Sequence, residues 1–291
     1  MLLNATHVSS ERVSPMTEKS EANDSQQDEH LTSGWEEDVP VDDTVMRQFV
    51  LNLIDATRAA VLDLGGDVLD TPQFFAADVR RPATFFNTAV VRQPLFEESV
   101  KTFVPILNQW CSAGTGMMLL LSPWPTPDLR SHGWTLMGHP PVHLRPTGGA
   151  IPEDPPGIDI KPVTDFASLL HWEGVLIEGF PLDEMRDLPA GSLVAERMLS
   201  HSSCRRWVAY CNDKPVGAVL AHVSHGINQV ALVATLQEAR RAGIGESLTW
   251  RATMADRSLP AMLMSSDEGR SVYQRMGYLP LTRFTLWYRL R

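Results

Sequence analysis

Short apolar runs separated by polar, turn-forming residues dominate the C-terminal half of the 291-residue chain. Three such runs predict an antiparallel meander of strands at residues 206–211, 215–223 and 229–233. Further along, the pattern takes a helical period at 247–255 and then predicts strands at 261–266 and 284–289. A helix set between such runs indicates a mixed α/β architecture.

The N-terminal half has its own hydrophobic pattern. One apolar helical face is predicted by a spacing of four and three residues at Phe96, Val100, Phe103, Leu107 and Trp110. Strands are predicted to follow at 117–121 and 141–145. A second folded lobe is therefore expected at 44–146, joined to the lobe at 158–291 by a linker, 147–157, that is rich in glycine and proline.

The two halves share a spacing that indicates an internal repeat. Three features of the first half recur 144 positions later, namely Ser122 as Ser266, Gly133-Trp134 as Gly277-Tyr278, and Arg145 as Arg289. Short strand–helix–strand units can also look alike by chance, but a constant offset over three features favours true repetition.

A glycine-bearing loop joins the run at 230–233 to the helix that follows. Its spacing is Arg240-x-x-Gly243-x-Gly245. Glycines let backbone N–H groups approach phosphate oxygens, and a helix N-terminus adds unpaired donors and a positive dipole end. A tight turn before a helix is the simpler interpretation of the loop alone. The spacing resembles the [QR]-x-x-G-x-[GA] signature of the GNAT acetyltransferase superfamily.

A second motif strengthens this resemblance. Tyr273 precedes the Gly277-Tyr278 pair by four residues, in the order of the closing motif of the GNAT superfamily. The resemblance covers residues 158–291 and implies a GNAT fold, in which helices flank a splayed mixed central sheet. The N-terminal lobe resembles a degenerate GNAT-like unit, because no glycine pair follows its strand at 88–91 and Leu129 replaces Tyr273.

The resemblance also implies site residues. Tyr273 would be the general acid, although a packed helix aromatic is the alternative, and the backbone N–H of Val233 would stabilise the oxyanion. Acetyl-CoA would be held by Val233, Thr235, Arg240, Arg241, Ala242, Gly243, Ile244, Gly245, Glu246 and Ser266. Ser266 stands where many relatives have asparagine, and Glu246 is expected to point away from phosphate. The general base stays open between Glu173, Glu178 and water, and surface carboxylates are the alternative for both.

Charge and composition limit the remaining function classes. Residues 1–43 hold eleven acidic and two basic residues, so they account for −9 of the net charge of −10 and are expected to be disordered. The near-neutral remainder gives no support for nucleic-acid binding. Three cysteines fit neither a disulfide framework nor a metal site, and the longest apolar run is too short to span a membrane. A cytoplasmic monomer or homodimer without metal is expected.

The function implied is that of an acetyl-CoA-dependent N-acetyltransferase. It would transfer an acetyl group to a primary amine, of a small molecule or a protein, by direct attack in a ternary complex. The alternative is a catalytically inactive acyl-CoA-binding protein with a regulatory or scaffold role. The acceptor and its acyl chain preference cannot be read from the sequence.

Overall fold

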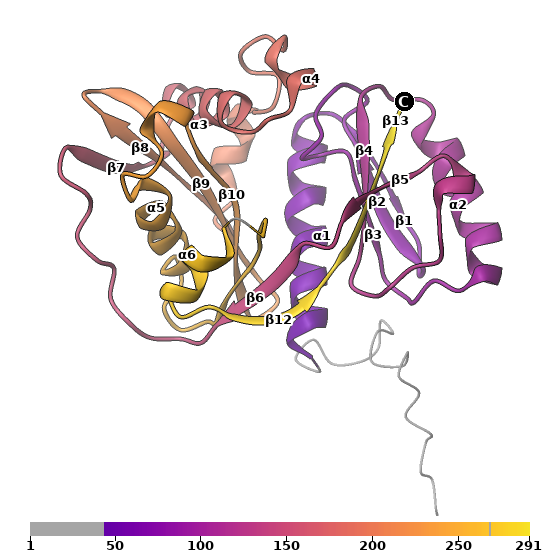
Figure 1. Cartoon of the computed structure of the whole chain (residues 1–291). Coiled ribbons are helices and arrows are strands. Elements are labelled where there is room, and N and C mark those ends of the chain that lie inside the picture. The colour runs from indigo at the N-terminus through magenta and orange to yellow at the C-terminus, as the bar shows by residue number, and fades with distance from the viewer. Residues whose placement is uncertain (1–43, 268) are drawn as a thin grey trace, which may run out of the picture. The chain divides into compact units, whose positions relative to one another are not determined.

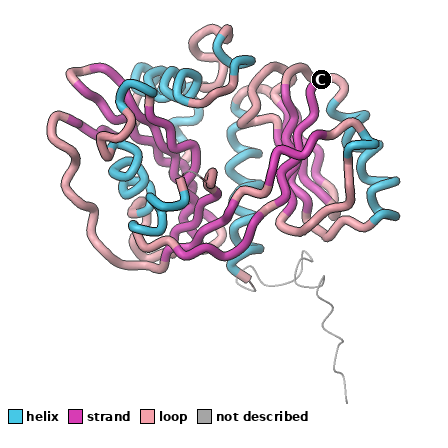
Figure 2. The backbone as a smooth tube through the Cα atoms, viewed as in Figure 1, coloured by secondary structure: helices cyan, strands magenta, loops and turns pink. Residues whose placement is uncertain are grey.

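The computed structural model describes residues 44–267 and 269–291, so the acidic segment 1–43 lies outside the described residues. Helices and strands are interspersed along the chain, and the strands form two mixed sheets (Figures 1 and 2). The helices are α1 (Val45–Asp63), α2 (Glu97–Cys111), α3 (Phe166–Gly179), α4 (Asp183–Arg186), α5 (Ile244–Thr253) and α6 (Arg270–Arg275). None of the described helices is long and apolar enough to cross a membrane.

The first sheet has the strand order β1-β2-β3-β4-β13-β5. Its strands are β1 (Asp67–Asp70), β2 (Phe74–Asp78), β3 (Thr88–Val91), β4 (Met117–Ser122), β5 (Thr135–Gly138) and β13 (Thr285–Leu290). The second sheet has the order β12-β6-β11-β10-β9-β8-β7. Its strands are β6 (Pro141–Arg145), β7 (Ile158–Pro162), β8 (Cys204–Cys211), β9 (Lys214–Ser224), β10 (Ile227–Thr235), β11 (Ala261–Met264) and β12 (Leu279–Arg283). The predicted meander is β8-β9-β10.

The two sheets exchange one strand each. β13 pairs with β4 and β5 of the first sheet, and β6 pairs with β11 and β12 of the second. In Figure 1 the yellow β13 accordingly runs among the indigo and magenta strands of the first sheet. The boundaries 44–146 and 158–291 therefore do not describe the sheets, because the final strand of each predicted lobe completes the sheet of the other.

The order of elements matches the repeat predicted from the sequence. The series β3-α2-β4-β5-β6 corresponds to β10-α5-β11-β12-β13 at the same offset of 144 positions, so that Met117 corresponds to Ala261 and Pro141 to Thr285. The predicted apolar face of α2 is largely confirmed, since Val100, Phe103 and Leu107 are buried. Phe96 is an exception, because it lies at the N-cap and is 64% exposed.

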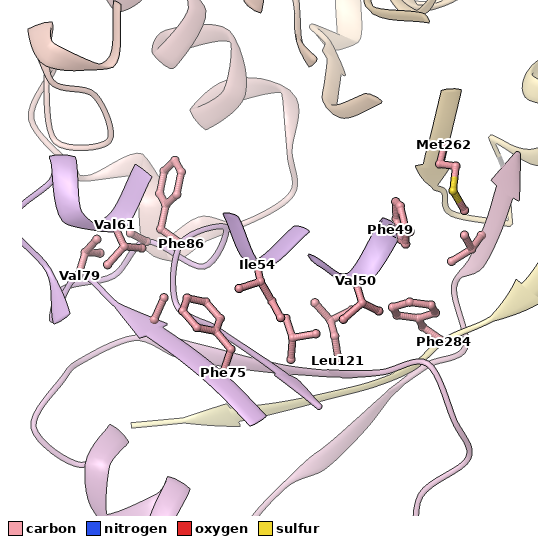
Figure 3. Close-up of a cluster of buried hydrophobic side chains, with 14 of the residues drawn as sticks. Phe49, Val50, Ile54, Val61, Phe75, Val79, Phe86, Leu121, Met262 and Phe284 are labelled. Carbon is pink, nitrogen blue, oxygen red and sulfur yellow. The ribbon is translucent and has the colours of Figure 1, made fainter. Parts of the chain in front are cut away.

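Helix α1 packs against both sheets. Its residues Phe49 and Ile54 belong to a buried cluster that also contains Phe75 of β2 and Met262 of β11 (Figure 3). The ring of Phe284, just before β13, meets that of Phe49 edge-on at 5.8 Å between centroids. The core of the described residues therefore runs across the region where the strands are exchanged.

Candidate functional site

A bulge interrupts β10, the strand that carries Val233, the predicted oxyanion donor. The register with β9 shifts between Ala231 and Ala234, and Leu232 has a positive φ of 52°. β10 pairs with the parallel β11 only from Asn228 to Val230. Beyond Val230, the edge of β10 that faces β11 has no ladder partner among the described residues, which leaves N–H and C=O groups available to a ligand that lies there as an added strand.

The glycine loop leads into the N-terminus of α5. Gly243 is the N-cap residue, and its φ of 78° belongs to the left-handed region that favours glycine. A Cβ there would also lie 3.3 Å from Cγ of Pro155. α5 begins at Ile244, so the first-turn N–H groups of Ile244, Gly245 and Glu246 have no partner within the helix. The loop has the geometry of an anion site.

A cavity of about 430 Å³ joins this loop to the bulge of β10 and to α6. Of the predicted residues, the ones that line it are Val233, Thr235, Arg240, Arg241, Gly243, Ile244, Gly245, Glu246 and Tyr273. Thr249, Val272 and Arg275 complete much of the wall. Two predicted cofactor residues, Ala242 and Ser266, are not among its lining residues.

Ser266 does not line the cavity, and its hydroxyl accepts a hydrogen bond from the N–H of Gly269, at 3.3 Å. The side chain is exposed and shapes the turn that leads to α6. Ala242 is exposed in the loop itself.

Tyr273 reaches the cavity from α6. Its ring is half-buried and stacks edge-on against Tyr278, with 6.0 Å between centroids. No side chain or backbone group among the described residues is hydrogen-bonded to its hydroxyl. Burial raises the pKa of Tyr273 above its ordinary value of 10.0, so the phenol keeps its proton at neutral pH.

The exchanged strand β6 contributes a residue that the sequence did not predict. His143 is completely buried, and its ring centroid lies 6.2 Å from that of Tyr273. Its Nε2 is 3.1 Å from Oγ of Ser265, while its Nδ1 is buried without a partner. Burial lowers the pKa of His143 from 6.5, which favours the neutral ring. The local sequence carries no signal for this contact, because it depends on the register of β6 against β11.

Two charged residues of the loop differ from expectation. Arg240 donates from Nη2 to the carbonyl of Gly179, at 3.1 Å, and from Nε to that of Thr235, at 3.2 Å, so it ties the loop to α3. Glu246 was expected to point away from phosphate, but it lines the cavity. Its carboxylate lies 3.8 Å from the guanidinium of Arg275, and this pairing offsets the negative charge.

The two candidate bases lie elsewhere. Glu173 is buried, and its two carboxylate oxygens accept hydrogen bonds from the N–H groups of Gly191 and Leu193, each at 2.6 Å. This carboxylate therefore fixes the loop after α4. Glu178 is exposed on α3. Neither residue lines the cavity, so their role as base stays a prediction.

The corresponding place in the first sheet has different chemistry. β3 pairs with β2 without a register shift, so it lacks the bulge. The first turn of α2 carries Glu97 and Glu98 at the position where α5 presents the glycine loop. Two carboxylates at a helix N-terminus would repel phosphate. Leu129, which corresponds to Tyr273, is completely buried.

The sequence matches no protein-family model and no curated protein. Solved structures are similar over most of the chain. A GCN5-related N-acetyltransferase from Kribbella flavida aligns with a TM-score of 0.58 at 19% identity, over 81% of this chain and 95% of that one. A conserved protein of unknown function from Staphylococcus epidermidis gives 0.54 at 15% identity, over 78% and 95%. An acetyltransferase of the GNAT family from Novosphingobium aromaticivorans, named as putative, gives 0.53 at 14% identity, over 83% and 96%.

These likenesses extend over both sheets, since they cover more than three quarters of the chain. The chain therefore has the fold of the GCN5-related N-acetyltransferases, with two related lobes in tandem.

Proposed function

We propose that this protein binds acetyl-CoA in the 430 Å³ cavity and transfers the acetyl group to a primary amine. The observation that carries the proposal is the meeting of three features in one cavity. These are the unpaired edge of β10, the glycine loop at the start of α5, and the unpartnered hydroxyl of Tyr273. Each supplies something that acetyl transfer needs, namely a backbone edge for a strand-like ligand, donors for phosphate, and an acid.

The pyrophosphate of acetyl-CoA would be held by the free N–H groups of the first turn of α5. Arg241 lies next to this turn and forms no ion pair with any other described residue, so its charge is available to phosphate. The pantetheine arm would lie along the edge of β10. In this pose the N–H of Val233, at the bulge, supports the oxyanion, an effect of about 3–4 kcal/mol in measured oxyanion holes.

The acceptor nitrogen would attack the thioester carbonyl carbon and form a tetrahedral intermediate. As it collapses, the C–S bond breaks and the sulfur takes the proton of the Tyr273 hydroxyl. The amine loses one proton to solvent or to a base, and the tyrosinate is then reprotonated. Because burial raises the pKa of Tyr273, the phenol is protonated at neutral pH and has a proton to give when the thiolate forms.

A calorimetric titration of the protein with acetyl-CoA tests the proposal. One site per chain is expected, because the first-lobe counterpart carries Glu97 and Glu98 instead of glycines. Gly243→Glu should abolish binding. The matched control is Gly65→Glu, since Gly65 has a similar φ of 73°, has nothing within 4 Å of an added Cβ, and lies far from the cavity in the sequence.

Each outcome is informative. Loss of binding in Gly243→Glu with binding kept in Gly65→Glu supports the site. Two sites per chain would contradict the degenerate state of the first lobe. Absence of binding in the unmodified protein would overturn the proposal. Binding without acetylation of any amine would favour the inactive regulatory or scaffold protein.

A further inference from the structure

A second cavity, of about 110 Å³, lies on the other face of β10. Leu232 lines this second cavity, whereas its neighbour Val233 lines the first. Among the described helices and strands, β10 is the one that borders both cavities, and it does so on the two sides of its bulge. The remaining wall of the second cavity comes mainly from α1, from Trp172 of α3 and from Leu220 of β9.

Arg206 of β8 lines the second cavity and has an unusual environment for a cation. Its side chain is 7% exposed, and it forms no ion pair with any carboxylate of the described residues. Nη1 donates to the carbonyl of Met198, at 3.1 Å, and the guanidinium lies 5.4 Å from the ring centroid of Trp172. Nε is buried without a partner, and no described group accepts from Nη2. Buried charges in proteins are normally paired, so this one lacks its anion.

Among the described residues, Asp63 is the only carboxylate that lines the second cavity, and it is already engaged. Asp63 lies 2.7 Å from Nε2 of His201 and 3.3 Å from Nε of Arg197. Gln229 of β10 also lines the cavity, is 6% exposed, and has an Oε1 atom without a hydrogen-bond partner. A donor fork and an amide therefore face a space whose other walls are mostly apolar.

We infer that the second cavity receives the acceptor, and that the acceptor is a small apolar α-amino acid whose carboxylate binds Arg206. This inference rests on the proposed acetyl transfer. A planar guanidinium pairs with a planar carboxylate through two parallel hydrogen bonds, and one arginine supplies one compensating charge. The apolar walls receive the side chain, and the amine is directed to the bulge at Leu232, where the thioester would lie.

The first lobe would help to enclose the acceptor. Leu53, Ala60 and Asp63 of α1 belong to the second cavity, as does Phe86, which precedes β3. The acceptor would therefore be enclosed between the catalytic sheet and a helix of the lobe that has lost its own cofactor site.

The test compares L-leucine with 3-methylbutylamine, which differs from it only by the carboxylate. With the full chain and acetyl-CoA, kcat/KM for leucine should exceed that for the amine by about 100-fold, the scale of losing one partner of a buried charge pair. Arg206→Met should remove this preference, so that kcat/KM for leucine falls to about that for 3-methylbutylamine. Arg205→Met is the matched control, because Arg205 is adjacent on β8 but exposed and should leave the preference unchanged.

Two readouts separate this inference from the proposed function. Calorimetry with acetyl-CoA reports the first cavity, and the leucine preference reports the second. Normal acetyl-CoA binding together with equal rates for both amines, or with acetylation of neither, overturns the inference and leaves the cofactor site in place. If Arg206→Met does not fold, Arg206→Lys keeps the charge but loses the fork, and an unchanged preference in that variant would count against the inference.

Discussion

At the scale of single residues, the environment of Tyr273 decides whether the phenol can act as an acid. Its hydroxyl has no partner among the described residues, so no hydrogen bond must break before it gives up its proton. Burial raises its pKa, and Tyr278 beside it is bonded through its own hydroxyl to Oγ1 of Thr253, at 2.7 Å. Of the two tyrosines of the motif, only Tyr273 is therefore free to serve the cavity.

Replacing Tyr273 by phenylalanine should lower kcat for acetyl transfer by about 10²–10⁴-fold, the range for a general acid. Acetyl-CoA affinity should change little, because the ring stays in place. The rate of CoA thiol release measures the first effect and calorimetry the second. Tyr288→Phe, on β13 and outside the cavity, should retain full activity.

The titration of Tyr273 also predicts how kcat depends on pH. In the proposed mechanism the protonated phenol is the active form, so kcat should persist up to the ordinary tyrosine pKa of about 10 and fall only above it. A loss of kcat between pH 7 and 9 in the unmodified protein that disappears in Tyr273→Phe would contradict the raised pKa.

Residue-level prediction could single out residues that line the cavity where their spacing is local, while their roles stay predictions. Gly243, Gly245 and Tyr273 could be identified because a loop and a helix carry them at fixed spacing. His143 could not be identified, because it approaches Tyr273 only through the pairing of β6 with β11. The orientation of Glu246 toward the cavity likewise depends on Arg275, which belongs to a different helix.

At the scale of elements, α1 is joined to the second sheet by a polar contact inside an apolar core. Asn52 is completely buried, and its Nδ2 group donates to the carbonyls of His222 and Ser224 at 3.1 and 3.0 Å. Its Oδ1 lies 3.0 Å from Nδ1 of His222, so this nitrogen carries the hydrogen. Asn52 and His222 satisfy each other's polar groups only while Nδ1 of His222 carries a hydrogen and α1 is in place.

Acid should destabilise the folded state at His222, because a second proton would turn the buried ring into a cation. Burial lowers the pKa of His222 from 6.5 to about 4, so the folded state disfavours the proton that the unfolded chain accepts. The contribution of neutral His222 to the free energy of unfolding is therefore fully present above pH 6.5. It is lost as the pH falls toward 4, and the loss is about 3 kcal/mol. Urea unfolding at pH 7 and pH 4 measures the loss.

His222→Gln provides the comparison, because an amide keeps hydrogen-bonding capacity but does not titrate. The variant should be less stable at pH 7 and should lose less stability on acidification than the unmodified protein. Equal losses in both proteins would show that another group is responsible. Asp55 is the nearest alternative, since its hydrogen bond with His225 lowers the pKa of its carboxyl, but it titrates below 3.8.

The types of several elements could be predicted from the sequence, whereas their strand partners could not. The helical face of α2 and the strands β8, β9 and β10 follow from hydrophobic periodicity, which is a local property. β6 and β13 have the same pattern, and both close a strand–helix–strand unit. The choice between neighbouring or exchanged sheets depends on long-range packing, to which periodicity is insensitive.

At the scale of the whole molecule, the exchange makes each sheet dependent on the other half of the chain. It is reinforced beside β13, where the guanidinium of Arg291 forms an ion pair with Asp78 of β2. The two side chains are 3% and 0% exposed, and Nη2 of Arg291 also donates to the carbonyl of Thr115 at 2.8 Å. The pair connects sequence positions 78 and 291 in the interior of the first sheet.

Replacing Arg291 by alanine should lower the free energy of unfolding by about 3 kcal/mol, because Asp78 would keep a buried charge with only Arg80 as partner. Both lobes should still unfold together. Urea transitions followed by tryptophan fluorescence and by far-UV circular dichroism should coincide, and separate transitions would contradict the interdependence. Arg130→Ala, which breaks an exposed pair with Asp128, should leave the midpoint unchanged.

The exchanged strands also set an order of events during synthesis. Ser122 of β4 is paired in register with Thr285 of β13, and β5 has β13 as its only strand neighbour. At about 5–20 residues per second, the ribosome needs roughly ten seconds or more to synthesise the chain between β4 and β13. Throughout that interval the first sheet has an open edge at β4, which invites pairing with other chains. The first lobe to be made is therefore among the last to be finished, and the nascent chain needs protection until residue 290 has emerged.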